Sequence, residues 1–398
     1  MKIVIHDFGG YAFVRPLSVA LALAGHTVYH LWCGSIVSTP SGDLSRRPTD
    51  PSTLHFVRID LDAPLQKHRY LKRLQQERAY GKRLVATLRT LDADVILSGN
   101  TPLDAQASLL RFARQNQIPV IYWLQDLLGV ASETVLKKRL WLVGQWIGTY
   151  YVHKERRLLR DSAAVVPISK AFLPLLATYG IPSERIHLIE NWAELPSGEP
   201  PRRDNDWSRR HHLGAGCRFM YAGNLGQKQR ASHLADIARA TAKDGAEMIV
   251  VSQGEAVSSL EQACQEEGLI NIRFLPFQPA EDVPQMLAAA DVMVALLEPD
   301  AGAYCQPSKI LTYMAAGKPI LASLPRENPA FRLLEDTRCG LPVDAQDFFG
   351  LTDRAQALAL DPDYREVLGS RALKAAQDRF QIEPIAESFL KVLTPHPG

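Results

Sequence analysis

QPSKILTYMAAGKPILA, residues 306–322, predicts a short helix followed at once by a buried strand. Pro307 suits the first helical position, and Gly317 suits a left-handed stop after the last turn. Ser308 and Lys309 therefore fall in the first turn, where free backbone N–H groups attract an anion. A lysine there opposes the helix dipole, so its position favours a phosphate beside it. A plain surface lysine near a helix cap is an equal alternative.

The same alternation of strand and helix continues on both sides of this stretch. Apolar runs separated by helical segments predict an α/β protein with parallel sheets. The expected strands are residues 2–6, 27–32, 54–58, 95–98, 120–124, 164–167, 218–221, 247–252, 272–274, 292–296 and 319–322. The expected helices include residues 13–24, 71–91, 232–242, 257–267 and 282–289.

A segment rich in proline and charge, residues 194–203, is the best candidate for a linker. A chain of 398 residues is long enough for two domains, and a new strand begins soon after this segment. We therefore expect two Rossmann-like domains, at residues 1–197 and 198–378. Ligands bind beyond the carboxyl ends of strands in such sheets, so two facing domains would form a cleft.

The composition is that of a soluble globular protein, without a run of 18 apolar residues. The first residues lead into a strand without the features of a signal peptide. The five cysteines are scattered, and no CxxC pair indicates zinc or a disulfide framework. These observations predict a cytoplasmic protein. Several short DxD strings look like strand ends or turns, and we assign no metal to them.

Charge is unevenly divided along the chain. Residues 1–200 hold 24 Lys and Arg against 17 Asp and Glu, whereas residues 201–398 hold 21 against 26. Two basic stretches, residues 66–89 and 137–152, lie in the first half, and the second includes Trp and Tyr. This pattern fits helices at an anionic membrane surface on the inner face of the plasma membrane. Partly buried helices with a solvated face are the alternative; no nucleic-acid motif is present.

Glycine turns follow the first strand of each half. Gly9 and Gly10 would let a diphosphate approach the backbone, although a tight turn requiring positive φ is the alternative. Neither a GxGxxG motif nor an acidic residue after the second strand is present, which argues against a nicotinamide cofactor. In the second half, Gly223 is followed by Lys228 and Arg230. These cations would neutralise a leaving diphosphate, or would simply be solvated.

A carboxylate, Asp126, follows the buried strand at residues 120–124. At that end of a sheet it could contact a substrate hydroxyl or serve as the N-cap of the next helix.

Together these residues resemble glycosyltransferase family 4, over nearly the whole chain. The similarity is nearest to bacterial enzymes of the colanic-acid type that assemble cell-surface polysaccharides. The matching pieces are IHDFGG (5–10) with AGHTV (24–28), WLQD (123–126), ERRLLR (155–160) with Ile168-Ser169, YAGNLG (221–226), FLPFQP (274–279) and residues 307–322. The resemblance implies the two-domain GT-B fold, with residues 379–398 forming a helix that returns to the first domain.

The resemblance also implies roles for individual residues. Gly223, Asn224 and Lys228 would lie at the donor diphosphate, Phe277 at the nucleobase, Ser308 and Lys309 on the phosphates, Gly9 and Gly10 in the facing loop, and Asp126 beside the acceptor. One departure concerns a pair of glutamates that the family often carries eight positions apart. The matching register gives Tyr304 and Thr312, neither acidic, and a start at Glu298 gives Gln306. Thr312 would supply a weaker substitute for the second glutamate, and Gln306 is also expected on the donor side.

The implied activity is a retaining, metal-independent transfer of a sugar from UDP or GDP to a lipid-linked or oligosaccharide acceptor, without a cofactor. Charge that develops on the donor β-phosphate would be stabilised by Lys228 and Lys309. Two alternatives remain: a sugar-nucleotide epimerase with the same fold, and a non-catalytic protein that binds a nucleotide sugar.

Overall fold

The computed structural model describes residues 1–36, 44–66, 69–195, 198–226, 230–299 and 309–394. The chain forms two compact units. One comprises Met1–Asn191 with Ile382–Gly398, and the other comprises Trp192–Gln381. Each unit has its own parallel sheet and its own hydrophobic core, and each is described separately below.

The sheet of the first unit has six parallel strands in the order β3-β2-β1-β4-β5-β6. Their bounds are β1 Lys2–Asp7, β2 Thr27–Cys33, β3 Leu54–Ile59, β4 Val95–Gly99, β5 Val120–Leu124 and β6 Ala164–Pro167. Strand order reverses between β1 and β4, which places the switch point of the sheet where these two strands end.

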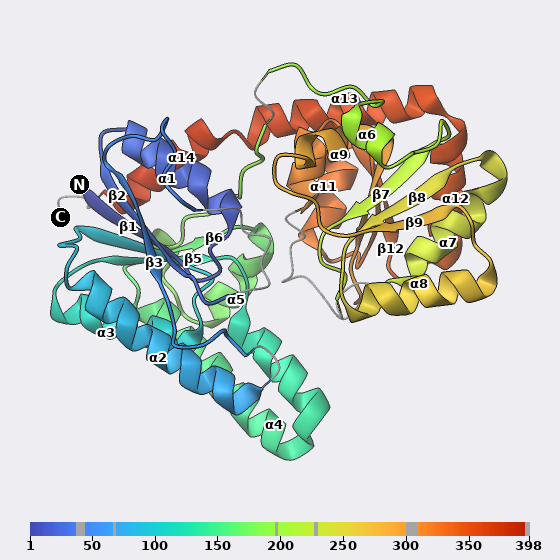
Figure 1. Cartoon of the computed structure of the whole chain (residues 1–398). Coiled ribbons are helices and arrows are strands. Elements are labelled where there is room, and N and C mark those ends of the chain that lie inside the picture. The colour runs from blue at the N-terminus through green and yellow to red at the C-terminus, as the bar shows by residue number, and fades with distance from the viewer. Residues whose placement is uncertain (37–43, 67–68, 196–197, 227–229, 300–308, 395–398) are drawn as a thin grey trace. The chain divides into compact units, whose positions relative to one another are not determined.

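Helices cover both faces of this sheet (Figure 1). The bounds are α1 Arg15–Leu23, α2 Tyr70–Leu88, α3 Leu103–Gln115, α4 Leu128–Asp161, α5 Leu173–Thr178 and α14 Ile382–Leu393, with short 3-10 turns at Ala12–Val14, Lys170–Phe172 and Ser183–Arg185. The C-terminal helix α14 packs against α1, and its Phe389 ring lies 5.3 Å from that of Trp123 on β5. The last helix of the chain therefore completes the core of the first unit.

Helix α4 folds back on itself, as Figure 1 shows. A straight helix would separate Glu133 from Gly148 by about 22 Å. Instead, a β-carbon at Gly148 would lie 2.7 Å from the Glu133 Cα, and the Thr149 hydroxyl donates to Glu133 over 3.4 Å. A β-carbon at Gly129 would likewise lie 2.9 Å from the carbonyl oxygen of Tyr151. We call this antiparallel pair of arms the α4 hairpin; its turn lies between Glu133 and Gly148.

The second unit repeats the strand order of the first, with six parallel strands arranged β12-β11-β10-β7-β8-β9. Their bounds are β7 Arg218–Ala222, β8 Glu247–Val251, β9 Ile272–Leu275, β10 Val292–Leu296, β11 Ile320–Leu324 and β12 Gly340–Asp344. The helices are α6 Asp206–Arg210, α7 Ser232–Thr241, α8 Glu255–Glu267, α9 Val283–Ala289, α10 Lys309–Ala315, α11 Pro329–Thr337, α12 Phe348–Leu360 and α13 Pro362–Arg379, with a 3-10 turn at Ala242–Asp244.

Each strand expected from the sequence is present, but the sequence analysis missed β12. Its sequence, GLPVD, contains a glycine and a proline, which favour a loop over a central strand. The strand is tolerated because it lies at the edge of the sheet, where it pairs only with β11.

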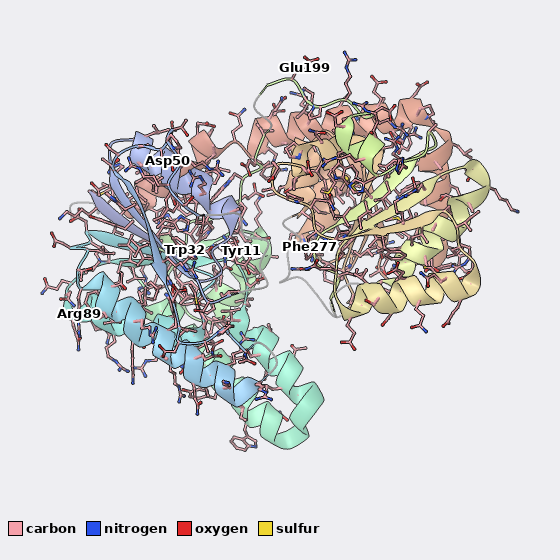
Figure 2. All side chains as sticks on the ribbon, viewed as in Figure 1. Tyr11, Trp32, Asp50, Arg89, Glu199 and Phe277 are labelled. Carbon is pink, nitrogen blue, oxygen red and sulfur yellow. The ribbon has the colours of Figure 1, made fainter. Side chains whose placement is uncertain are left out.

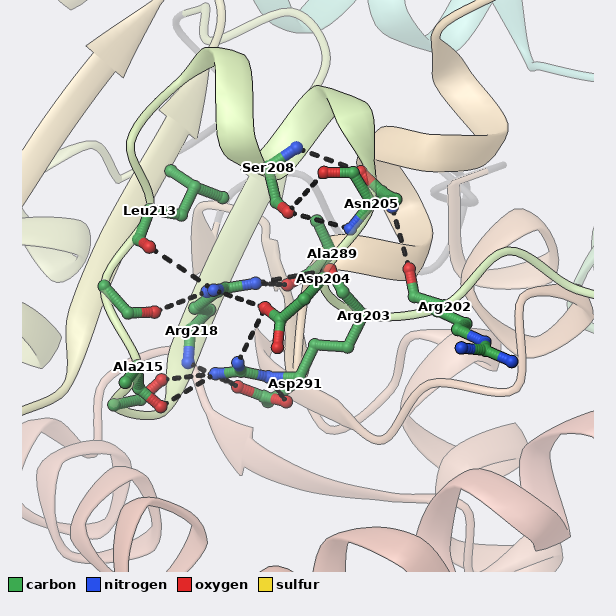
Figure 3. Close-up of polar contacts among 12 residues, drawn as sticks. Arg202, Arg203, Asp204, Asn205, Ser208, Leu213, Ala215, Arg218, Ala289 and Asp291 are labelled. Carbon is green, nitrogen blue, oxygen red and sulfur yellow. Dashed lines mark hydrogen bonds and ion pairs between the residues drawn. The ribbon is translucent and has the colours of Figure 1, made fainter.

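A polar network ties the segment before β7 to the start of β10 (Figure 3). Arg203 donates to both carboxylate oxygens of Asp291, at 2.8 and 2.9 Å, and the Arg218 backbone N–H donates to the same carboxylate at 2.8 Å. The buried Arg218 guanidinium donates to Asp204 at 2.8 Å and to several backbone carbonyls, including that of Gly214. Asp291 is therefore the shared acceptor that joins the two segments.

Candidate active site

In the second unit, the polar group most relevant to function is the Lys309 ammonium, which lies at the switch point of the sheet. β7 and β10 are neighbours there. Gly223 follows β7, and Lys309 opens α10, the helix that comes after β10. Ligands of open α/β sheets bind at this position, because the loops on either side of the switch point diverge. The sequence placed both residues at strand or helix ends, and the fold brings them together.

Lys309 lies over the backbone of Gly223. A β-carbon built on Gly223 would be 3.3 Å from the Lys309 Nζ, and the φ of +123° at this residue is one that side chains rarely permit. The Nζ also lies 3.8 Å from the centroid of the Tyr221 ring, within range of a cation–π interaction. Glycine at position 223 therefore leaves the space that the ammonium group occupies.

The Lys309 ammonium is buried, and no hydrogen-bond partner for it is found among the residues that the structure describes. Burial lowers the pKa of Lys309 from 10.5 to about 7. A buried cation without a hydrogen-bonding partner is costly, and an anion placed beside it would recover that free energy. The site is therefore prepared to bind a negatively charged group.

Two tyrosines fix this lysine relative to β7. The Tyr313 hydroxyl, one helical turn beyond Lys309, donates to the Ala222 carbonyl over 3.0 Å. The Tyr221 hydroxyl donates to the Asn224 carbonyl over 2.5 Å and holds the glycine turn. The sequence analysis missed both tyrosines. Only their positions in the sequence could have indicated them. Tyr221 lies at the end of an expected strand, and Tyr313 lies four residues, about one helical turn, after Lys309.

The other residues predicted to bind the donor differ in their exposure to solvent. Asn224 and Thr312 are exposed, and Phe277 is half-buried in the loop that follows β9, where Figure 2 labels it. Gly317 has φ +65°, so the predicted left-handed end of α10 is confirmed. Lys228, Gln306 and Ser308 lie outside the described residues, and their roles stay predictions. The buried Ser252 hydroxyl, just after β8, has no hydrogen-bond partner in the described part of the chain and was not anticipated.

In the first unit, the Gly9–Gly10 turn follows β1 at the other switch point. Gly10 has φ +62°, and its N–H donates to the Asp7 carbonyl over 3.1 Å, so a tight turn is present. The Asp7 side chain accepts from the Tyr11 N–H at 2.6 Å and from the Asn100 amide at 3.3 Å. Burial raises the pKa of Asp7 to about 7. Asp7, which the sequence analysis did not single out, thus holds the turn to the end of β4.

Asp126 follows β5 and is exposed. Leu127, rather than Asp126, occupies the N-cap position of α4. The buried Glu155, on the returning arm of the α4 hairpin, accepts from the Gly129 N–H at 3.1 Å. Burial raises the pKa of Glu155 to about 7. Glu155 therefore satisfies the start of α4, and the exposed Asp126 lies just past the carboxyl end of β5.

Two family models match the chain in succession. A glycosyl transferase 4-like domain matches residues 8–192, and a domain of glycosyl transferases group 1 matches residues 216–361. The chain is a family 4-like glycosyltransferase. Each matched domain falls on one of the two sheets described above.

The similarity extends to curated and solved proteins. This glycosyltransferase is 25% identical over 166 residues to the putative colanic acid biosynthesis glycosyl transferase WcaI of Escherichia coli K12, a match that covers 41% of each chain. Among solved structures, sucrose-phosphate synthase from Thermosynechococcus elongatus has a TM-score of 0.75 at 17% identity, with 98% of both chains covered. Anabaena HepE, solved with UDP and glucose, has a TM-score of 0.72 at 17% identity, with 99% of both covered. These structures show that the glycosyltransferase has the GT-B fold.

Proposed function

We propose that the protein moves a sugar from a nucleotide-diphosphate donor to a hydroxyl group of a lipid-linked glycan, with retention of configuration, in the synthesis of a cell-surface polysaccharide. The observation that carries the proposal is the buried Lys309 ammonium at the Gly223 turn. HepE, which shares the fold, was solved with UDP and glucose, and WcaI is named for colanic acid biosynthesis. Retention rests on the family resemblance.

The chemistry that the proposal asks of these residues is charge stabilisation. When the bond between the sugar and the β-phosphate breaks, negative charge grows on the phosphate oxygens. Lys309 would supply a positive charge there, because an anionic diphosphate beside the buried amine favours its protonated form. Electrostatic stabilisation is most effective in such a buried site. Lys228 would add a second cation, and Ser308 would hydrogen-bond the phosphates. Phe277 would border the base, while Thr312 or Gln306 would bind the ribose or the sugar.

The acceptor side of the proposal lies in the first unit. Asp126 would accept a hydrogen bond from the attacking hydroxyl, because it is an exposed carboxylate just past β5. Gly9 and Gly10 would present backbone N–H groups to the donor diphosphate. Both roles follow from the family resemblance and are compatible with where these residues lie in their own sheet.

The proposal predicts that UDP or GDP is released only when an acceptor is present. Purified protein would be incubated with UDP-glucose or GDP-mannose, with and without a lipid-linked saccharide fraction from bacterial membranes. Release of the nucleoside diphosphate and labelling of the lipid fraction would both depend on that fraction. An epimerase would convert the donor without it, and a binding protein would leave the donor unchanged; either result would contradict the transferase.

We also propose that the α4 hairpin rests on the anionic inner face of the plasma membrane. Trp146 and Tyr150, on the returning arm, are 80% and 57% exposed, so two aromatic rings face solvent near one end of the hairpin. The basic helix α2, with exposed Lys72, Arg73 and Arg78, packs with α3, which also contacts α4. Exposed aromatic rings and exposed basic residues in the same unit match a lipid headgroup layer. Over the described residues, no helix is both long and apolar enough to cross a bilayer.

Vesicle flotation tests this surface. The protein should float with vesicles that contain phosphatidylglycerol and should remain behind with pure phosphatidylcholine, because basic residues supply part of the attraction. The double change Trp146→Ser and Tyr150→Ser should reduce flotation. Phe349→Ser, which removes an aromatic side chain that is 81% exposed in the second unit, should not. Equal binding to both lipids, or no effect of the double change, would refute the membrane proposal.

A further inference from the structure

Four aromatic side chains of the first unit contact one another in series, from its core to its surface. Phe389 on α14 contacts Trp123 on β5, with ring centroids 5.3 Å apart, and both side chains are buried. Trp123 contacts Phe13 at 6.1 Å, and Phe13 contacts Tyr11 at 6.0 Å. Tyr11, at the outer end of this series, is 39% exposed. The exposed ring therefore rests on the half-buried Phe13, which in turn contacts the buried Trp123.

The two glycines after β1 make room for aromatic rings. A β-carbon on Gly9 would overlap the Tyr11 ring, and one on Gly10 would lie 2.8 Å from the Cδ1 of Trp32. Tyr11 and Trp32 thus pack against the same turn, one ring on each glycine. Figure 2 labels both side chains. The Tyr11 backbone is fixed as well, because its N–H donates to the Asp7 carboxylate at 2.6 Å. An exposed ring held this firmly loses little conformational entropy when it binds a ligand.

The charges of two carboxylates act on the Tyr11 phenol. Burial raises the pKa of Tyr11, and the charges of Asp7 and Asp126 raise it further. The hydroxyl therefore remains a hydrogen-bond donor at neutral pH, while the exposed Asp126, just after β5, is an acceptor whose charge reaches it. The carboxyl ends of β1 and β5 thus present an aromatic face, a donor and an acceptor together.

We propose that Tyr11 stacks on a pyranose ring of the acceptor, with Asp126 accepting hydrogen bonds from that sugar's hydroxyl groups. A pyranose has an apolar face of C–H groups and a rim of hydroxyls, and the exposed ring with its neighbouring carboxylate complements both. Tyr11 then determines specificity, because it selects an acceptor that ends in a sugar ring over one that offers only a lipid alcohol. The inference rests on the proposed transferase function and names the part of the acceptor that is recognised.

Saturation-transfer NMR tests the inference with simple sugars. Methyl α-D-glucopyranoside and methyl β-D-galactopyranoside would be added separately to the full-length protein. Wild type should saturate the ring C–H protons of at least one of them. Tyr11→Ala should weaken that signal about fivefold, because an aromatic contact of this kind contributes about 1 kcal/mol. Tyr11→Phe, which keeps the ring and loses only the hydroxyl, should retain most of it, and Phe349→Ala, which removes a remote exposed ring, should leave it unchanged.

Two further measurements separate the possible failures. Tyr11→Leu keeps apolar bulk against Gly9 without an aromatic ring, so it should lose the sugar signal even if Tyr11→Ala folds poorly. UDP titrated into the same samples should bind every Tyr11 variant as it binds wild type. No signal from wild type with either glycoside, or an equal signal from wild type and Tyr11→Leu, would overturn the inference. If UDP also fails to bind wild type, the proposed transferase function fails with it.

Discussion

Lys309→Ala is expected to lower kcat/KM by about 10²-fold, the usual cost of removing one group that stabilises developing charge in a transition state. The fold should be unaffected, because the ammonium is buried without a hydrogen-bond partner among the described residues and its removal relieves a desolvation cost. Activity would be measured with the donor and acceptor identified by the release assay, and stability by thermal unfolding.

Lys318 offers a matched control in the same unit. Its ammonium is also largely buried, but it donates to the carbonyls of Ala288 and Ala290 at 2.8 and 2.7 Å, at the end of α9. Lys318→Ala should therefore lower the unfolding temperature and leave the turnover of the folded protein unchanged. Near-normal kcat/KM in Lys309→Ala would exclude the charge-stabilising role, and a loss of the fold in that variant would point to a structural one.

The same lysine predicts a pH dependence of UDP binding. Its pKa of about 7 means that the ammonium is charged below neutral pH and loses its proton above it. UDP is already fully charged at pH 7, since the last phosphate ionisation lies near pH 6. The Kd for UDP should therefore rise by up to about tenfold per unit above pH 7, because binding must then restore the lost proton. In Lys309→Ala this rise should disappear; a Kd for wild type that stays constant from pH 7 to 9 would contradict the assignment.

Asp291→Ala is expected to destabilise the second unit by about 2 kcal/mol, because it breaks a partly buried ion pair and removes the acceptor of a backbone N–H. The change leaves the Arg203 guanidinium without its bidentate partner and the Arg218 N–H without its acceptor (Figure 3). Urea denaturation, followed by tryptophan fluorescence, would show the loss as a lower midpoint, because Trp207 is fully buried in this unit.

Asp206 provides the comparison for Asp291. It pairs with Arg209 across one turn of α6, and both side chains are exposed, so the pair contributes little to stability. Asp206→Ala should leave the urea midpoint almost unchanged. If Asp291→Ala behaves in the same way, the Asp291 contacts drawn in Figure 3 do not stabilise the unit, and the Arg218 guanidinium is held by Asp204 and the backbone carbonyls without them.

Local patterns were enough to predict much of the fold. Apolar runs bounded by glycine and proline identified each strand except β12, because a strand that is buried on both faces must be apolar along its length. β12 was missed because Gly340 and Pro342 are typical of loops, and only its edge position permits them. The reversal of α4 was also not predicted: its sequence is helical throughout, and the close approach of Gly148 to Glu133 is a tertiary contact.

The candidate site was predicted only in part, for a similar reason. The place of Lys309 in a first turn could be read from Gly317, eight residues later, because a left-handed glycine marks the end of a helix. Its burial and its contact with Tyr221 could not, since they depend on how β7 and α10 pack. Asp7 was missed because its role depends on two hydrogen bonds from separate segments. Its carboxylate accepts one from the Tyr11 backbone N–H and one from the Asn100 side-chain amide.

The position of α14 constrains how the chain folds during synthesis. Phe389, fully buried against Trp123, comes from the last ten residues that the structure describes. On a translating ribosome, the first sheet is made before the second, yet its hydrophobic core lacks Phe389 until α14 has emerged, after the whole of the second unit. The C-terminal sheet, from Trp192 to Gln381, needs no later residues. We therefore expect the second unit to reach its folded state before the first. A stop codon placed shortly before α14 should leave the second unit folded and the first unit incomplete.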